Sequence, residues 1–132
     1  MPSKKTENDI SEEQYEIIEN YLKSYKFCRR VLSLKNYEDK YFDTLEWECE
    51  SPAEFSVARA KMYEVRHFIL GMKNGNEKLF LYYHYVHCNS VERCAELLGV
   101  SRASGFRLKR KALASAYRYS VATEKKLSAY GF

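Results

Sequence analysis

Residues 90–113 form a helix-turn-helix pattern, the feature that most constrains how this chain folds. Ser90 and Ser101 each precede a helical segment, where a serine hydroxyl caps free backbone N–H groups. Gly99 lies between the two segments and suits a turn residue with a left-handed backbone. Ala95 is small, as the close crossing of two such helices requires. The pattern therefore predicts two helices joined by a tight turn.

The second of these helices is strongly basic, and charge is uneven along the whole chain. Residues 1–60 contain 9 basic and 13 acidic residues, whereas residues 61–132 contain 13 basic and 5 acidic residues. This asymmetry indicates a C-terminal half that binds a polyanion, joined to a half that need not touch it. Because the basic residues follow a helix-turn-helix pattern, we expect the polyanion to be a nucleic acid.

The composition favours helices. The chain has 132 residues, enough for one domain, or a small domain with an appendage, and for a modest core. It contains only five Gly and two Pro, which disfavours a β sandwich. The expected fold class is all-α, a helical bundle with a long N-terminal helix and a C-terminal helix-turn-helix.

Helix start signals divide the first half of the chain. Ser11 and Gln14 form a capping box, with Ile10 and Tyr15 placed as a hydrophobic staple. The helix that follows is expected to run to about Leu34. Its apolar stripe has spacings of three and four residues and comprises Tyr15, Ile18, Leu22, Tyr25 and Leu32. Residues 35–50 are acidic and aromatic, and no helix signal defines their structure.

Ser51 and Pro52 mark a second helix start, with Pro at the first helical position. This helix is expected to end near Gly71. Its stripe comprises Phe55, Ala58, Met62, Val65 and Ile69. Asn74 and Gly75 indicate a turn, and an aromatic-rich helix is expected over residues 77–86. The expected organisation is a disordered N-terminus at 1–10, an acidic helical region at 11–50, a helix-turn-helix domain at 51–119 and a tail at 120–132.

The stretch 78–113, KLFLYYHYVHCNSVERCAELLGVSRASGFRLKRKAL, resembles region 4 of bacterial sigma-70-type factors. The resemblance covers about residues 54–118. Nothing in the chain resembles the sigma region that melts the −10 promoter element, so we do not expect a complete sigma factor. A solitary module of this kind behind an acidic N-terminus is similar to small phage-encoded ArpU- and RinA-like regulators. The resemblance implies a sequence-specific, double-stranded DNA-binding transcriptional regulator, encoded by a phage or prophage, that reads the major groove with the helix from Arg102.

The resemblance also implies roles for individual residues. The residues expected to reach base edges are Arg102, Ala103, Ser104, Phe106 and Arg107. Those expected to meet phosphates are Ser90, Arg93, Ser101, Lys109, Arg110 and Lys111. Arg107 is the first choice for a bidentate contact to guanine. Phe106 has two open interpretations, contact with a thymine methyl group or packing in the core. Gly105 stands where the family usually has Val or Ile, which predicts a recognition helix that is less rigid until it binds.

Other functions remain open at this stage. The module would also suit an RNA polymerase-binding role without sequence readout, or a phage small terminase subunit in DNA packaging. Because one helix-turn-helix reads about half a turn of duplex, a homodimer on a two-part site is expected. The stripe of the first helix is a candidate dimer surface, although it equally suits packing on the chain's own C-terminal half.

Further residues carry alternatives of their own. A metal site from His84, His87, Cys88 and Cys94 matches no common zinc spacing, and ordinary packing is expected instead. Tyr82, Tyr83 and Tyr85 are expected to divide between core and surface rather than to stack on bases. Trp47 suits either a core or an interface. The four Cys are expected to be free thiols, largely buried.

No catalytic or cofactor-binding pattern is present in the sequence. It has no Gly-rich phosphate loop, no nucleophile elbow and no convincing pair of catalytic carboxylates, and we expect neither an enzyme nor a cofactor. No apolar run reaches the length of a membrane span, and no signal-peptide pattern is present. A cytoplasmic location and no membrane partner are therefore expected.

Overall fold

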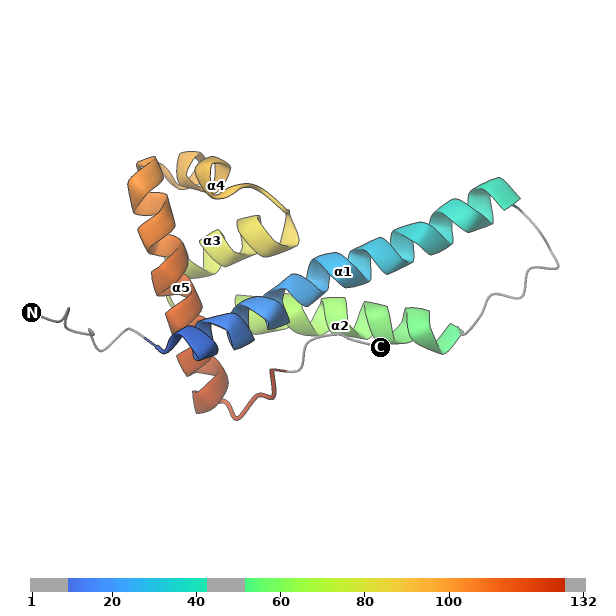
Figure 1. Ribbon diagram of the computed structural model, residues 1–132, viewed down its shortest axis with the longest axis horizontal. Helices are drawn as coiled ribbons and strands as arrows, with labels where there is room; N and C mark the ends of the chain where they lie inside the picture. The colour runs from blue at the N-terminus through green and yellow to red at the C-terminus, as the bar shows by residue number, and fades with distance from the viewer. Residues whose placement is uncertain (1–9, 43–51, 128–132) are drawn as a thin grey trace, which may run out of the picture.

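The computed structural model describes residues 10–42 and 52–127, with side chains at 10–33 and 56–127, and every regular element in these residues is helical. The elements are α1 (Glu12–Phe42), α2 (Pro52–Leu70), α3 (Gly75–Leu81), the π-helical turn η1 (Tyr82–Val86), α4 (Val91–Leu98) and α5 (Arg102–Ala122). Helices α1 and α2 lie side by side, and α5 crosses the first turns of α1 (Figure 1). The expectation of an all-α fold is confirmed. In the described residues, no helix is both long and apolar enough to span a membrane.

Helix α1 begins at the expected capping box. The backbone N–H of Ser11 donates to Gln14 Oε1 at 3.0 Å, and the N–H of Gln14 donates to Ser11 Oγ at 3.1 Å. Ile10 packs against the same hydrophobic cluster that contains Tyr15, as a hydrophobic staple does. Local sequence therefore determines where this helix starts.

The apolar stripe of α1 packs into the protein's own core. Tyr15, Ile18, Leu22 and Tyr25 are buried, and Leu32 is half-buried. The expected end near Leu34 is wrong, because α1 continues to Phe42. Residues 35–42 contain no Gly or Pro that would stop a helix. Trp47, Cys49 and the expected Ser51 cap lie outside the described residues, as do the N-terminus at 1–9 and the last five residues of the tail.

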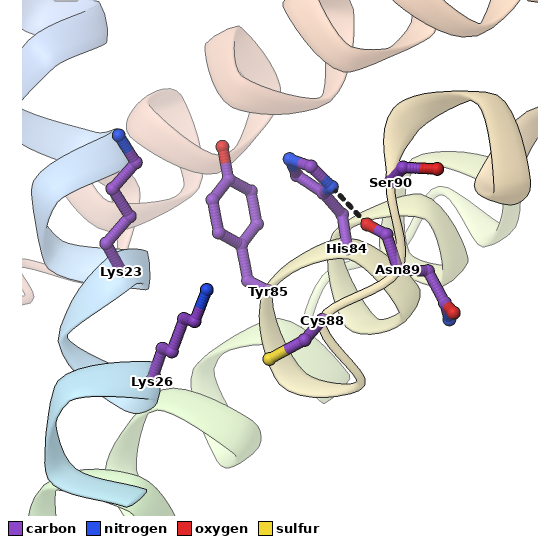
Figure 2. Close-up of a pocket in the computed structure, with 7 residues that line it drawn as sticks. All are labelled: Lys23, Lys26, His84, Tyr85, Cys88, Asn89 and Ser90. Carbon is purple, nitrogen blue, oxygen red and sulfur yellow. Dashed lines mark hydrogen bonds between the residues drawn. The ribbon is translucent and has the colours of Figure 1, made fainter. Parts of the chain in front are cut away.

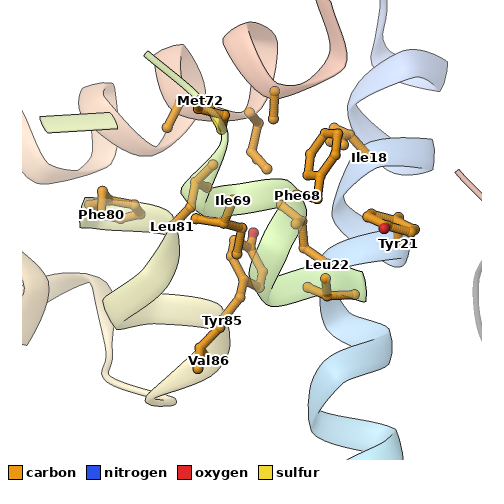
Figure 3. Packing of buried hydrophobic residues seen from close by; sticks show 14 of the residues in the cluster. Ile18, Tyr21, Leu22, Phe68, Ile69, Met72, Phe80, Leu81, Tyr85 and Val86 are labelled. Atoms are coloured by element: carbon orange, nitrogen blue, oxygen red, sulfur yellow. The ribbon is translucent and has the colours of Figure 1, made fainter. Parts of the chain in front are cut away.

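One hydrophobic core joins the two halves of the chain (Figure 3). Tyr21 and Phe68 pack edge to face, with ring centroids 5.4 Å apart, and this contact joins α1 to α2. Residues from all six elements contribute to the core, including Ile18, Tyr21, Leu22, Ile69, Phe80, Leu81 and Cys94, all fully buried, together with Ala112 and Ala116 of α5. Helix α1 therefore shares its core with α4 and α5.

Helix α3 starts two residues earlier than expected. Asn74 is its N-cap rather than part of a free turn, because Asn74 Oδ1 accepts a hydrogen bond from the N–H of Glu77 at 2.9 Å. The helix then widens into η1, where the N–H of His87 donates to Tyr82 O at 3.1 Å across five residues. This π-helical turn was not expected from the sequence. It allows the neighbouring residues Tyr85 and Val86 both to be buried.

Candidate nucleic-acid interface

Helices α4 and α5 follow each other across a short turn and begin with the expected caps. Ser90 Oγ accepts from the N–H of Arg93, and Ser101 Oγ accepts from the N–H of Ser104, each at 3.1 Å. Gly99 ends α4 with φ +72° and ψ +30°, in the left-handed region where a side chain would be strained. Ser90, Gly99 and Ser101 therefore lie in the cap and turn positions predicted from the sequence.

Gly105 is the point at which α5 passes closest to α4. Gly105 is buried, and a Cβ atom built on it would lie 2.8 Å from Ala95 Cβ and 3.6 Å from Val91 Cγ1. The sequence suggested that Gly105 removes a side chain from beneath the recognition helix and loosens it. The structure corrects this interpretation, because the space that Val or Ile would occupy is filled by α4 itself. A small residue at both 95 and 105 permits the close crossing.

The opposite side of the first turns of α5 is exposed. Arg102, Ala103, Phe106 and Arg107 lie on this surface, with spacings of three and four that place them on one side of the helix. Phe106 is 47% exposed, so the interpretation as a core residue is wrong. Its ring lies beneath the guanidinium of Arg102, whose Cζ is 5.9 Å from the ring centroid. An exposed aromatic ring and two guanidinium groups therefore share the outer face of α5.

An ion pair and two hydrogen bonds connect the residues of this face to their neighbours in α4 and α5. Arg102 Nη2 lies 3.2 Å from Glu92 Oε2 of α4. Arg107 Nη2 donates to Ser104 Oγ at 3.2 Å, and Ser104 also accepts from Ser101 Oγ at 3.0 Å. Ser104 is thus half-buried and engaged with its neighbours, whereas both arginines remain largely exposed. The exposed pairs are weak enough to exchange for other partners.

The basic residues further along α5 divide into two sets. Lys109 Nζ lies 3.3 Å from Glu19 Oε2 of α1, and Arg110 Nη2 lies 3.0 Å from Glu12 Oε2. The guanidinium of Arg110 also lies over the ring of Tyr15, with Cζ 4.3 Å from its centroid. Of the other expected phosphate contacts, Lys111 is exposed, and Arg93 is exposed and pairs with Glu96 at 2.8 Å. The acidic start of α1 thus neutralises the middle of the basic helix.

Glu19 lies at the centre of the contact between α1 and α5. Tyr85 Oη donates to Glu19 Oε2 at 2.7 Å, and Lys23 Nζ lies 4.0 Å from Oε1. Burial by itself would raise the pKa of Glu19, but the hydrogen bond from Tyr85 and the charges of Lys109 and Lys23 lower it below the ordinary value. Burial, the hydrogen bond to Glu19 and its charge raise the pKa of Tyr85. The cluster holds α5 against α1 with an ionised carboxylate.

Glu64 of α2 makes an equivalent cluster below α5. Tyr21 Oη donates to Glu64 Oε2 at 2.6 Å, and Lys125 Nζ lies 2.9 Å from the same oxygen. Burial again opposes ionisation, but the hydrogen bonds from Tyr21 and Lys125 and the nearby Lys61 keep the pKa of Glu64 below its ordinary value. This ion pair fixes the segment that follows α5, part of the region expected to be a tail.

The cysteine and histidine residues near η1 form no metal cluster. Within the described residues, no three His, Cys, Asp or Glu side chains are grouped as metal ligands. Cys28 and Cys94 are buried free thiols and Cys88 is an exposed one, and burial raises the pKa of Cys28 to about 11. His84 Nδ1 lies 2.7 Å from Asn89 O. Tyr82 and Tyr83 are half-buried and Tyr85 is buried, which confirms the expected division of the tyrosines.

The structure adds one basic site that the sequence interpretation did not include. Lys23 and Lys26 project from α1 toward His84, Tyr85 and Ser90, and together they line a pocket of about 360 Å³ (Figure 2). The signal was present in residues 23–30, KSYKFCRR, which hold four basic residues and no acid. The net negative charge over residues 1–60 concealed this run.

The arrangement therefore offers an exposed face on α5 that comprises Arg102, Ala103, Phe106 and Arg107, and a separate basic run on α1. No protein-family model, curated protein or solved structure matches this chain.

Proposed function

We propose that this protein is a sequence-specific transcriptional regulator that binds double-stranded DNA by placing the first turns of α5 in the major groove. The observation that supports this most strongly is the close crossing of α4 and α5 at Gly105. It leaves Arg102, Phe106 and Arg107 exposed on the side of α5 that faces away from α4. An α-helix with its side chains is about 10–12 Å wide, and the major groove is about 12 Å wide. The dimensions and the charge of this face suit that groove.

The chemistry of the exposed face supports base readout. The exposed side chain of Arg107 makes one hydrogen bond, to Ser104. Its guanidinium presents two parallel donors that match guanine O6 and N7. Phe106 offers an apolar surface for a thymine methyl group. Arg102 would exchange Glu92 for a base or a phosphate, since an exposed ion pair contributes at most about 1 kcal/mol.

The remaining basic residues suit different tasks. Lys111 is exposed and is assigned to a phosphate. Arg110 would first have to leave Glu12, an exposed pair that is easily exchanged. Lys109 is half-buried against Glu19, so we assign it to the α1–α5 contact and not to DNA. This division departs from the sequence interpretation, in which Lys109, Arg110 and Lys111 acted together.

A single helix-turn-helix of this kind covers about half a turn of duplex. We therefore propose a homodimer on a two-part site. The resemblance to region 4 of sigma factors adds RNA polymerase as a further partner, and the similarity to ArpU- and RinA-like regulators adds a phage or prophage as the source.

Selection of bound sequences from a pool of random duplexes tests the proposal. One sequence should be enriched, and Arg107→Ala should lower the affinity for it by about 5- to 150-fold, the equivalent of about 1–3 kcal/mol. The same variant should relax the preference at one base pair. Arg66→Ala, at an exposed position on α2, should leave affinity unchanged. Enrichment of no sequence would rule out specific readout. A promoter effect that survives Arg107→Ala would instead indicate a module that acts through RNA polymerase.

A further inference from the structure

The pocket between α1, η1 and the start of α4 has the character of an anion site. Two lysines, Lys23 and Lys26, are among its lining residues, together with Ser90 at the start of α4 (Figure 2). Its volume of about 360 Å³ is roughly ten times that of one water molecule, which occupies about 30 Å³ in the liquid. No carboxylate is among the lining residues. The pocket is therefore positive and large enough for a phosphate group.

The basic character of the pocket extends along α1. Lys23, Lys26 and Arg30 have spacings of three and four residues and lie on one side of the helix, and all three are exposed. Arg29 reaches across to the same region, where its Nη1 lies 3.7 Å from Cys88 Sγ. Glu19 is the only acidic residue paired with Lys23 among the described residues, at 4.0 Å. The run therefore presents an excess of positive charge beside the pocket.

The pocket is also linked by two contacts to α5, the helix that exposes Arg102, Phe106 and Arg107. Ser90 is followed directly by Val91, whose side chain and carbonyl group pack against Gly105 in the first turns of α5. Tyr85, another lining residue, shares Glu19 with Lys109 of α5. Through these contacts the pocket lies beside the elements that hold the start of α5 in place.

Building on the function proposed above, we infer that this pocket binds a phosphate group of the DNA backbone on the strand flanking the groove that α5 enters. Lys23 and Lys26 donate to the phosphate oxygens, while Ser90 Oγ caps α4 by accepting from the N–H of Arg93. His84 donates its Nδ1 hydrogen to Asn89 O, because a carbonyl oxygen only accepts. Burial lowers the pKa of His84, so it shapes the pocket without adding charge at neutral pH.

The N-terminal half then has two roles in DNA binding. Its acidic first turns hold α5 through Glu12 and Glu19, while its basic middle contacts the polyanion directly. Phosphate contacts fix the register of a protein on DNA without reading sequence. Helix α1 thus orients α5 in the groove as well as supporting it.

Paired lysine variants test the site. Lys23→Gln with Lys26→Gln removes the two pocket charges. Lys73→Gln with Lys126→Gln removes the same charge elsewhere, since Lys73 lies beside Ser115 and Arg118 in the C-terminal half of α5. The pocket variant should weaken binding to selected and unrelated duplexes by the same factor. Its slope of log affinity against log salt should be shallower by about 0.9 for the lost phosphate contact. The control variant should keep the slope of the unmodified protein.

Neutral phosphates locate the contact on the DNA. An uncharged methylphosphonate is placed at each backbone position of the duplex in turn. At one flanking position it should lower the affinity of the unmodified protein. At that same position it should leave the affinity of the pocket variant unchanged. A pocket variant with an unchanged slope, while Arg107→Ala still weakens binding, would overturn the inference and leave the proposed function intact. If the unmodified protein binds no duplex, both fail. In that case inorganic phosphate is added and the NMR amide resonances of Asn89 and Ser90 are followed. A shift of these resonances would assign the pocket to free phosphate instead.

Discussion

Replacing Gly105 by Ala tests the close crossing of α4 and α5. Two effects oppose each other in this variant. Ala stabilises a helix interior by about 1 kcal/mol relative to Gly. The added Cβ, however, would lie 2.8 Å from Ala95 Cβ, a separation that real Cβ atoms do not adopt, so the two backbones must move apart. Overpacking of this kind typically costs about 1–3 kcal/mol. The expected net change is a loss of roughly 0–2 kcal/mol in the free energy of unfolding.

The companion variant Ala95→Gly isolates the steric effect. Alone, it loses about 1 kcal/mol of helix propensity and about 0.8 kcal/mol of methyl burial. In the double variant the methyl group moves from α4 to α5, so the propensity terms cancel and the clash disappears. The double variant should therefore be within about 1 kcal/mol of the unmodified protein, with a coupling energy of about 2–4 kcal/mol between the two sites.

Urea unfolding followed by circular dichroism at 222 nm measures these differences through the transition midpoint. Control measurements on Gly75→Ala give the effect of the substitution where no atom lies within 4 Å of the new Cβ. A Gly105→Ala protein that gains about 1 kcal/mol, as propensity alone predicts, would refute the close crossing. Additive effects of the two single variants would refute it as well.

Two further predictions concern the turn and the buried carboxylates. Gly99→Ala should destabilise the protein by about 1–2 kcal/mol, because φ is +72° there, and a midpoint equal to that of Gly75→Ala would contradict the left-handed turn. The pKa values of Glu19 and Glu64 lie below their ordinary 4.5, so their stabilisation is present above that pH and is lost as the pH falls through the lowered values. His84, with a pKa below 6.5, adds a loss that begins near pH 6.5. Urea midpoints measured from neutral to acidic pH should fall accordingly, and less steeply below pH 4.5 for a Glu19→Gln, Glu64→Gln variant. An identical pH dependence in that variant would show that other groups govern acid unfolding.

Local signals predicted the parts of this fold that depend on a few neighbouring residues. Ser11, Ser90 and Ser101 cap their helices as expected, and Gly99 adopts the left-handed turn. Each of these outcomes depends on hydrogen bonds or backbone angles within four residues, which a sequence pattern describes directly.

The missed features depend on contacts between distant segments. Gly105 looked like a weakness because the position of Ala95 across the crossing is set by the tertiary fold. The ion pair between Lys109 and Glu19 was not foreseen because the two residues lie 90 positions apart in the chain. The pocket at Lys23 and Lys26 requires α1 to pass beside η1 and Ser90, and no spacing within either segment indicates this. The π-helical turn likewise places Tyr85 toward Glu19, a contact between two elements.

The salt dependence of duplex binding tests the central claim most directly. Each phosphate neutralised by a basic side chain contributes about 0.9 to the slope of log affinity against log salt. With Arg102, Arg107, Lys111 and the pocket of α1 on the DNA, the unmodified protein should bind its selected duplex with a steep, linear decrease in affinity as salt rises. An affinity independent of salt would contradict the account, because a duplex bound through this basic face must release counterions.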